Sequence, residues 1–228
     1  MARGGRLRGV KVYDCQDPVQ RDEGIAAAVA ALRRGDLVVL PTDTLYGLGA
    51  DAFSKPAVGA LFRAKQRGRD MPIVVTVGSR KTLDGLVHRL PPSARDLVDA
   101  FWPGALTVIV EHAPTLDWDL GETDGTVAVR MPMHPVALEV LREVGPVALS
   151  SANRTGQPPA VTVEQAQEQL GSSVRVYLDG GPCPAAVPST IVDLTGEVPQ
   201  VVRAGAISVE RLRAVVPELV EPEPATEG

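Results

Sequence analysis

The sequence is poor in the residues on which several common classes of site depend. Its 228 residues include only 2 cysteines and 3 histidines, and Phe, Trp and Tyr together make up 4% of the chain. Cys15 and Cys183 lie far apart and neither belongs to a C-x-x-C pair, which excludes a disulfide framework and a structural zinc site. Function must therefore come from other side chains.

The chain also lacks an excess of positive charge and a long apolar run. Lys and Arg number 23 against 28 for Asp and Glu, a net charge of -5, so a polyanion must bind to a local patch. The longest stretch without a charged residue, Gly180–Val192, has 13 residues, whereas a membrane span needs about 20 apolar residues. The basic start, Met1–Lys11, is followed by neither an apolar segment nor a signal cleavage site. We expect a cytoplasmic protein without a membrane partner.

The remaining composition is that of a globular α/β domain. Hydrophobic residues make up 44% of the chain and the mean hydropathy is +0.05, which suffices for one core. Apolar periodicity and capping residues predict alternating helices and strands. Helices are expected after Asp17, Ser54, Ser79, Ser93, His134 and Thr162 and from Ser208, and strands at Leu37–Leu40, Met71–Val77, Leu106–Val110, Thr126–Arg130, Val147–Leu149, Val174–Leu178, Ile191–Leu194 and Val198–Val202.

This order predicts one domain over residues 1–216. The last two strands read as a hairpin, so the sheet is not purely parallel. Beyond Arg213 the chain holds four glutamates, several prolines and no Lys or Arg. Residues 217–228 are therefore predicted to be a disordered tail.

Three segments carry candidate chemistry, and the first is the loop-like stretch Leu40–Ala52. It follows an expected strand and contains Thr42, Thr44 and two glycines, and loops at strand ends bind ligands in α/β proteins. A dinucleotide-binding turn is disfavoured, because too many residues separate Leu40 from Gly47 for a tight strand-to-helix connection.

The second segment is a cationic cluster at the end of the second expected helix. From Leu61 to Lys81 there are six basic residues and one acidic residue, in a chain that is acidic overall. A solvated helix end is one explanation. However, Gly68 breaks the helix directly after Lys65 and Arg67, so both are expected to project into solvent toward phosphates. The chain has no Walker A sequence, so ATP would be bound by side-chain cations.

The third segment, Gly145–Pro159, runs from an apolar strand into hydroxyl, amide and turn residues. An esterase nucleophile at Ser150 is disfavoured, since the surrounding sequence is not G-x-S-x-G and no histidine is placed as a base. Two interpretations remain: a turn that satisfies its own backbone, or a set of donors for carboxylate or phosphate. Arg130, at the end of an expected strand, suits a bidentate carboxylate contact.

The joint order of these motifs resembles the YrdC/Sua5 family. The motifs that carry the resemblance are Pro41–Leu48, Lys65–Arg67, Phe101–Thr107, Val129–Arg130, Ser150–Asn153, Ser189–Asp193 and Arg203–Gly205. The resemblance covers about Gly24 to Arg213, and it implies a twisted mixed parallel and antiparallel sheet flanked by helices, with a concave, positively lined face. The chain is similar to the short form, without the additional C-terminal domain of the longer Sua5 type.

The family resemblance implies a nucleotidyltransferase. Members convert L-threonine, bicarbonate and ATP to threonylcarbamoyl-AMP, pyrophosphate and water, the first step of the t6A modification at position 37 of tRNA, and pass the product to t6A-transfer proteins. The roles implied here are triphosphate binding by Lys65 and Arg67, which are the catalytic candidates, nucleotide contacts by Ser151, Asn153 and Arg203, and threonine contacts by Thr42, Arg130, Ser150 and Ser189. Mg²⁺ is expected to bridge the phosphates and not to occupy a dedicated protein site.

Two departures from the family pattern and two other functions stay open. Gly68 stands where many members have proline, and Thr76 where many have histidine. A carbamoyl-adenylate domain like that of HypF proteins shares the expected fold, but this chain lacks room for the other HypF regions. A non-catalytic module that binds double-stranded RNA or tRNA by shape is the alternative from a different class.

Overall fold

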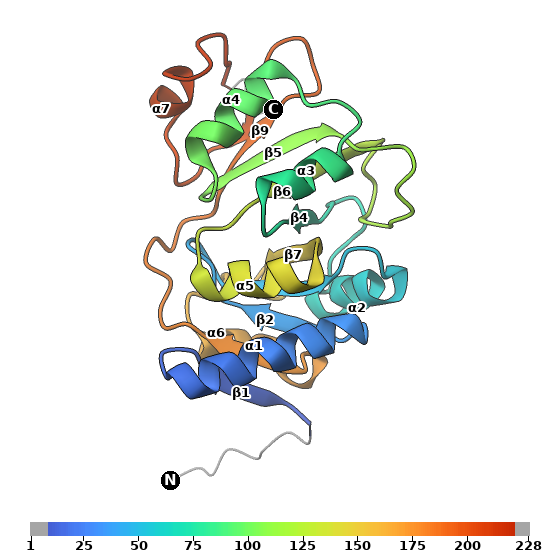
Figure 1. The fold of residues 1–228 in the computed structure, drawn as a ribbon, viewed down its shortest axis with the longest axis vertical. Helices are drawn as coiled ribbons and strands as arrows, with labels where there is room; N and C mark the ends of the chain where they lie inside the picture. The colour runs from blue at the N-terminus through green and yellow to red at the C-terminus, as the bar shows by residue number, and fades with distance from the viewer. Residues whose placement is uncertain (1–8, 222–228) are drawn as a thin grey trace.

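The computed structural model describes residues 9–221 and shows one sheet that runs the length of the molecule (Figure 1). The order of its ten strands is β1-β8-β2-β3-β7-β4-β6-β5-β9-β10. The strands are β1 (Lys11–Asp14), β2 (Val38–Leu40), β3 (Gly47–Asp51), β4 (Val74–Thr76), β5 (Leu106–Glu111), β6 (Thr126–Arg130), β7 (Val147–Ser151), β8 (Val176–Asp179), β9 (Thr190–Asp193) and β10 (Gln200–Arg203). Parallel pairs such as β4 with β6 alternate with antiparallel pairs such as β5 with β6, which confirms the mixed sheet.

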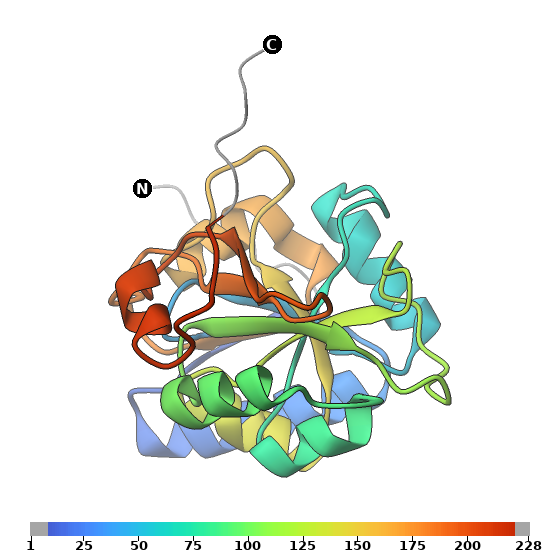
Figure 2. The ribbon, with the colours of Figure 1, turned by 90° about the horizontal axis from the view of Figure 1, so that it is seen from above.

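Helices cover both sides of this sheet. They are α1 (Pro18–Arg33), α2 (Lys55–Lys65), α3 (Arg80–Leu86), α4 (Pro92–Phe101), α5 (Pro135–Val144), α6 (Val163–Leu170) and α7 (Val209–Arg213), with a 3₁₀ turn, η1, at Gly171–Ser173. Figure 2 shows α1, α3, α4 and α5 on one side of the sheet and α2 and α6 on the other. Within residues 9–221, no helix has the length and apolar character required to cross a bilayer.

Helix starts follow the capping residues, with one exception. The side chains of Asp17, Ser54, Ser79 and Thr162 each accept a hydrogen bond from the first turn of the helix that they precede, as expected for N-caps. The prediction that Ser93 caps a helix is wrong. The helix α4 begins one residue earlier, at Pro92, because proline fixes a helical φ and lacks the N–H that a cap would satisfy.

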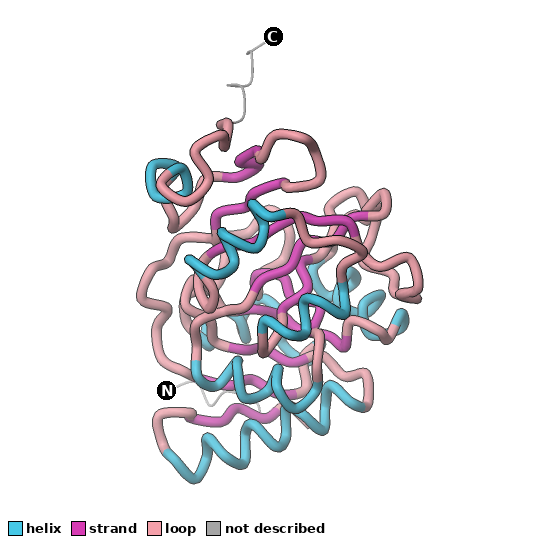
Figure 3. The backbone as a smooth tube through the Cα atoms, turned by 45° about the horizontal axis from the view of Figure 1, so that its top comes forward, coloured by secondary structure: helices cyan, strands magenta, loops and turns pink. Residues whose placement is uncertain are grey.

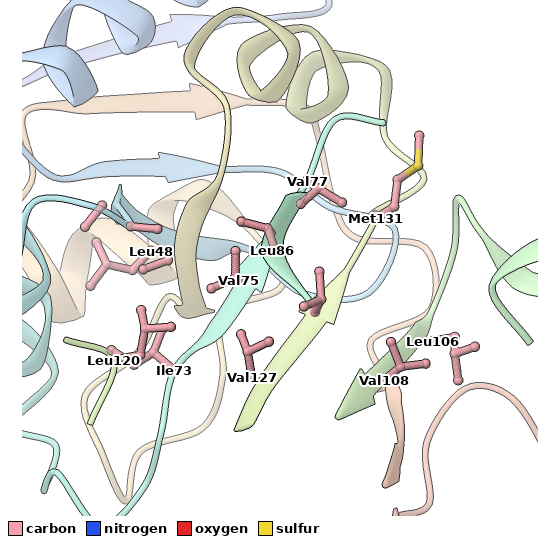
Figure 4. Close-up of a cluster of buried hydrophobic side chains, with 14 of the residues drawn as sticks. Leu48, Ile73, Val75, Val77, Leu86, Leu106, Val108, Leu120, Val127 and Met131 are labelled. Atoms are coloured by element: carbon pink, nitrogen blue, oxygen red, sulfur yellow. The ribbon is translucent and has the colours of Figure 1, made fainter. Parts of the chain in front are cut away.

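The core lies between neighbouring strands and the helices that cover them. Leu48, Val75, Val127 and Val108 come from four different strands and are 0–1% exposed; Figure 4 shows these side chains within one cluster. In Figure 3 the strands form the middle of the molecule and the helices its outer layers. This packing makes the sheet a rigid support for whatever lies at its strand ends.

Two strands were not expected from the sequence. The strand β1 was too short and too polar to recognise. The segment Gly47–Asp51 was interpreted as a loop, but it forms β3, which lies between β2 and β7 in the sheet. A side chain at Gly47 would place its Cβ 2.8 Å from the side chain of Leu149 on β7. Glycine at this position leaves room for the Leu149 side chain, and it hides the strand from sequence patterns.

The structure describes the first five residues of the predicted tail, 217–221. Residues 217–221 pack against the rest of the chain: Leu219 is 2% exposed, and Val220 exchanges backbone hydrogen bonds with Val201 and Pro199 at the β10 edge. The composition of this segment is acidic, but two apolar residues, Val216 and Leu219, suffice to anchor it. The rest of the predicted tail, 222–228, lies outside the described residues.

Replacing Leu219 tests this anchoring. Leu219→Ala should lower the free energy of unfolding by about 2–4 kcal/mol, because it empties a fully enclosed space, whereas Glu218→Ala, an exposed neighbour, should change it by less than about 0.5 kcal/mol. Urea denaturation measures both. Equal stability of the two variants would mean that residues 217–221 do not belong to the core.

Candidate functional site

A cavity of about 300 Å³ lies where the ends of β3, β7, β4, β6 and β5 meet the loops that follow β2 and precede β9. Strand register explains its polar floor. Thr76 on β4 pairs with Arg130 on β6, and Arg130 pairs with Thr107 on β5. Directly paired residues point to the same face of a sheet. Three buried polar side chains therefore stand in one row across three strands.

The structure brings eight of the nine predicted site residues to the wall of this cavity. They are Thr42, Arg67, Arg130, Ser150, Ser151, Asn153, Ser189 and Arg203. The segments that carry them are separated by up to about 160 residues in the sequence, and they converge because their strands are neighbours in the sheet. The ninth residue, Lys65, is not part of the wall.

Arg130 is a buried cation clamped by three partners. It is 7% exposed. Its Nε donates to the Gly104 carbonyl at 3.0 Å, one terminal nitrogen donates to Thr44 Oγ1 at 2.8 Å, and the other forms an ion pair with Asp43 Oδ1 at 2.6 Å. Burial lowers the pKa of Arg130, and Asp43 opposes that shift. Arg130 keeps two of its five N–H groups for a ligand.

Arg67 and Arg203 are held by backbone carbonyl oxygens. Arg67 donates to Met71 and Pro72 at 2.7 and 3.0 Å, and Arg203 donates to the Ser189 carbonyl at 2.7 Å. Burial lowers the pKa of Arg203, and the positive charges of Arg130 and then Arg67 lower it further. The guanidinium of Arg203 is therefore close enough to the other two arginines to be influenced by their charges, as expected of a site that binds an anion.

Ser189 lies between Arg203 and the polar row on the sheet. Its Oγ is 2.8 Å from Thr107 Oγ1 and 3.1 Å from the Arg203 guanidinium. A Cβ at Gly205 would lie 2.5 Å from the Pro188 carbonyl oxygen. The Arg203–Gly205 segment can therefore approach Ser189 only with glycine at that position.

Lys65 corrects the expectation that both cations of the second segment project into solvent. It is 1% exposed, and its Nζ donates to the carbonyl oxygens of Ser151 and Asn153 at 2.5 and 2.7 Å. Helix α2 ends at Lys65 with Gln66 in the left-handed conformation, which turns Arg67 toward the cavity and Lys65 toward the end of β7. Lys65 thus connects α2 to the segment that carries Ser151.

Asn153 and Thr42 have their hydrogen-bonding groups engaged within the protein. The amide of Asn153 donates to the carbonyls of Arg154 and Gln157, and its oxygen accepts from Lys65 at 3.3 Å. Thr42 Oγ1 donates to the Leu45 carbonyl at 2.6 Å and accepts from two backbone N–H groups. Both residues shape loops at the cavity wall, and a ligand would meet them only by displacing these bonds.

The hydroxyl groups of Ser150 and Ser151 are free for a ligand. Both residues are half-buried at the end of β7 and line the cavity, and within residues 9–221 neither hydroxyl has a side-chain hydrogen bond to another group. The interpretation of this segment as a set of donors for a carboxylate or phosphate stays a prediction. Their roles toward particular substrate atoms stay predictions.

Sequence reasoning assigned no role in the site to Asp43, Thr44 or Thr107, although the first two lie in the candidate segment Leu40–Ala52. All three lie in motifs that carried the family resemblance, but their contacts depend on strand pairing and loop closure. Thr76, noted as a departure from the family pattern, donates its hydroxyl to the Val147 carbonyl at 3.1 Å. Because this bond uses the hydroxyl hydrogen, Thr76 can only accept a hydrogen bond from a ligand.

The cavity contains no cage for a metal ion. Within residues 9–221, no three His, Cys, Asp or Glu side chains gather closely enough to bind one. The carboxylate of Asp43, next to the lining residues Thr42 and Thr44, forms an ion pair with Arg130. Mg²⁺ bound to nucleotide phosphates takes few protein ligands, and its presence in this site stays a prediction.

Comparison with models of protein families assigns the chain to one of these families. The profile of the Sua5/YciO/YrdC family, described as "Telomere recombination", matches residues 30–205. The chain belongs to this family. It is 59% identical to a putative threonylcarbamoyl-AMP synthase of Mycobacterium leprae over 210 residues, which cover 92% of this chain and 96% of that protein. It is 58% identical to a protein of the same description from Mycobacterium tuberculosis H37Rv, with 90% and 95% covered.

The fold of the family is shared with solved structures. Sua5 of P. abyssi, solved in complex with L-threonine, superposes with a TM-score of 0.87 at 32% identity. The superposition covers 93% of this chain but only 62% of that one, so this family member spans less than two thirds of the longer relative. The agreement confirms the expected α/β fold.

The titration of Lys65 gives a test of its burial. Burial, and secondarily the charge of Arg67, lowers the pKa of Lys65 from 10.5 to about 8. The unfolded chain therefore binds more protons between these pH values, and stability rises with pH there. Relative to Lys65→Met, wild-type protein should gain about 1.4 kcal/mol per pH unit above pH 8, measured by urea denaturation. Parallel stability curves would place the amine in solvent.

Proposed function

We propose that this family member is a threonylcarbamoyl-AMP synthase, which forms threonylcarbamoyl-AMP from L-threonine, bicarbonate and ATP. The observation that carries the proposal is one cavity with three inward-facing arginines and several hydroxyls, but no histidine or cysteine in its wall. Such a site is suited to positioning anions and stabilising charge, and not to nucleophilic catalysis. The names of the relatives support the same activity.

The chemistry requires no nucleophile from the protein. The threonine amine attacks the carbon of bicarbonate and forms a carbamate with loss of water. A carbamate oxygen then attacks the α-phosphorus of ATP, and the bond to the β-phosphate oxygen breaks to release pyrophosphate. The protein has to align two anions that repel each other and to offset the charge that develops on the phosphorus oxygens.

Arg130 is the proposed partner of the threonine carboxylate. Its two unused N–H groups match the two oxygens of a carboxylate, and its position is fixed by Asp43, Thr44 and Gly104. The Ser150 hydroxyl and the Ser189 oxygen line the same cavity and are the proposed contacts to the other polar groups of threonine.

Arg67 and Arg203 are the proposed partners of the nucleotide phosphates. Both lie on the cavity wall, and the carbonyl groups that hold them do not neutralise their charges. The Ser151 hydroxyl adds a donor, and Mg²⁺ is proposed to arrive bound to the triphosphate. Lys65 acts indirectly, because it fixes the backbone that carries Ser151 and Asn153. We further propose that the product serves t6A formation in tRNA and passes to a t6A-transfer protein.

Pyrophosphate release tests the proposed reaction. Purified protein with ATP and Mg²⁺ should release pyrophosphate only when both L-threonine and bicarbonate are present, because the carbamate is the nucleophile. Omission of either substrate is the control. RNA affinity that falls steeply with salt, without pyrophosphate release under any condition, would instead indicate a nucleic-acid-binding module.

A pair of arginines near the end of α2 tests the phosphate assignment. Arg67→Ala should lower kcat/KM by about 100-fold or more, since it removes a charge aimed at the reacting phosphates. Arg63→Ala, an exposed arginine of the same helix end that does not line the cavity, should have nearly wild-type kinetics. Similar kinetics for the two variants would refute the role of Arg67.

A further inference from the structure

The orientation of Arg67 depends on the turn that carries it, residues 66–72. Its guanidinium donates to the Met71 and Pro72 carbonyl oxygens at 2.7 and 3.0 Å, so it points where these two carbonyl groups allow. The turn also contains Gly68, whose backbone is less restricted than that of other residues. Contacts from outside the turn can therefore decide the orientation of Arg67.

A segment of the loop between β5 and β6, residues 119–122, makes such contacts on both sides of the two carbonyl groups. The backbone N–H of Glu122 donates to the Arg69 carbonyl at 2.9 Å. The Ile73 N–H donates to the Leu120 carbonyl at 3.1 Å. Figure 4 shows Leu120 next to Ile73 in the hydrophobic core, and each is 2% exposed. Leu120 therefore anchors the segment in the core, and the two backbone bonds hold the turn against it.

Gly121 lies where the segment and the turn come closest. Its φ is +103°, and a Cβ on it would lie 2.7 Å from the Arg69 carbonyl oxygen and 3.4 Å from the Pro72 Cα. The first distance is too short for a side chain, so the observed approach requires glycine. Asp119 adds an ion pair with Arg69, whose guanidinium also lies 5.5 Å from the centre of the Phe62 ring on α2. Arg69 is thus held from two sides.

We propose that the 119–122 segment orients Arg67 toward phosphate, with Gly121 and Asp119 as positioning residues. None of residues 119–122 lines the cavity, so the segment acts through the turn, whose carbonyl oxygens orient the Arg67 guanidinium. The proposal rests on the proposed function, in which Arg67 binds the nucleotide phosphates. A guanidinium that is oriented in advance binds phosphate more tightly than a mobile one, because ordering a mobile side chain costs conformational entropy.

Two glycines of the same loop allow a matched test. Gly121 and Gly125 both have a positive φ, +103° and +82°, so alanine strains the backbone at either position. Among the residues that the structure describes, nothing lies within 4 Å of a Cβ at Gly125. Gly121→Ala therefore adds a collision with the turn to a strain that Gly125→Ala also carries, and Gly125→Ala is the control.

Binding of inorganic tripolyphosphate, measured by calorimetric titration, reports on the orientation of Arg67. Gly121→Ala should weaken the affinity by about tenfold or more, as expected when a charge-assisted contact is lost, whereas Gly125→Ala should weaken it less than about twofold. In an Arg67→Ala background, Gly121→Ala should cause no further loss, because the side chain through which it acts is gone. A merely structural role would weaken binding equally in both backgrounds.

A second pair of variants covers the case in which Gly121→Ala does not fold. Asp119→Ala removes the ion pair with Arg69. Asp117→Ala, the control, removes the ion pair that the same loop forms with Lys55 at the start of α2. Only Asp119→Ala should weaken tripolyphosphate binding, by about threefold, since an exposed ion pair contributes little.

The outcomes separate this proposal from the proposed function. Equal affinities of folded Gly121→Ala and Gly125→Ala would overturn the positioning role. Where Gly121→Ala does not fold, equal affinities of Asp119→Ala and Asp117→Ala would overturn it, and so would an undiminished loss in the Arg67→Ala background. Wild-type protein that binds tripolyphosphate no more tightly than Arg67→Ala would refute the phosphate role of Arg67 itself, and this proposal with it.

Discussion

The site depends on a buried arginine that is bound by three residues from two separate segments. Arg130 ends a strand in the middle of the sheet, and its guanidinium is bound by Asp43, Thr44 and Gly104. A buried cation without such partners would be strongly destabilising. The loop after β2 must therefore reach across to β6, over the intervening β3, β7 and β4, and the cavity lies beside this closure.

Carbonyl oxygens hold the other cations of the site. Lys65, Arg67 and Arg203 all donate to backbone carbonyls. Carbonyl groups fix the position of a cation and leave its net charge in place, whereas a carboxylate would cancel it. This choice of partner keeps the cavity attractive to anions before any substrate arrives, and it spares the protein a large reorganisation during the reaction.

Local signals in the sequence predicted most of the secondary structure. The capping residues Asp17, Ser54 and Thr162 marked helix starts because capping is a contact within a few residues. β3 was missed because its Gly47 is not typical of a strand interior. The reason for glycine at this position is the side chain of Leu149, which lies about one hundred residues away in the sequence. Leu219 was assigned to a tail because its burial depends on packing against the body of the domain, which composition does not reveal.

The sequence by itself determined the fold class, the family and most of the polar residues that line the cavity, because these follow from periodicity and from motifs of a few residues. Only the tertiary structure decided what each residue does. It turned Lys65 inward and Arg67 toward the cavity, although two positions separate them, and it paired Asp43 with Arg130. Burial and partners depend on contacts between distant segments, so the same residue type serves as a ligand contact in one place and as a support in another.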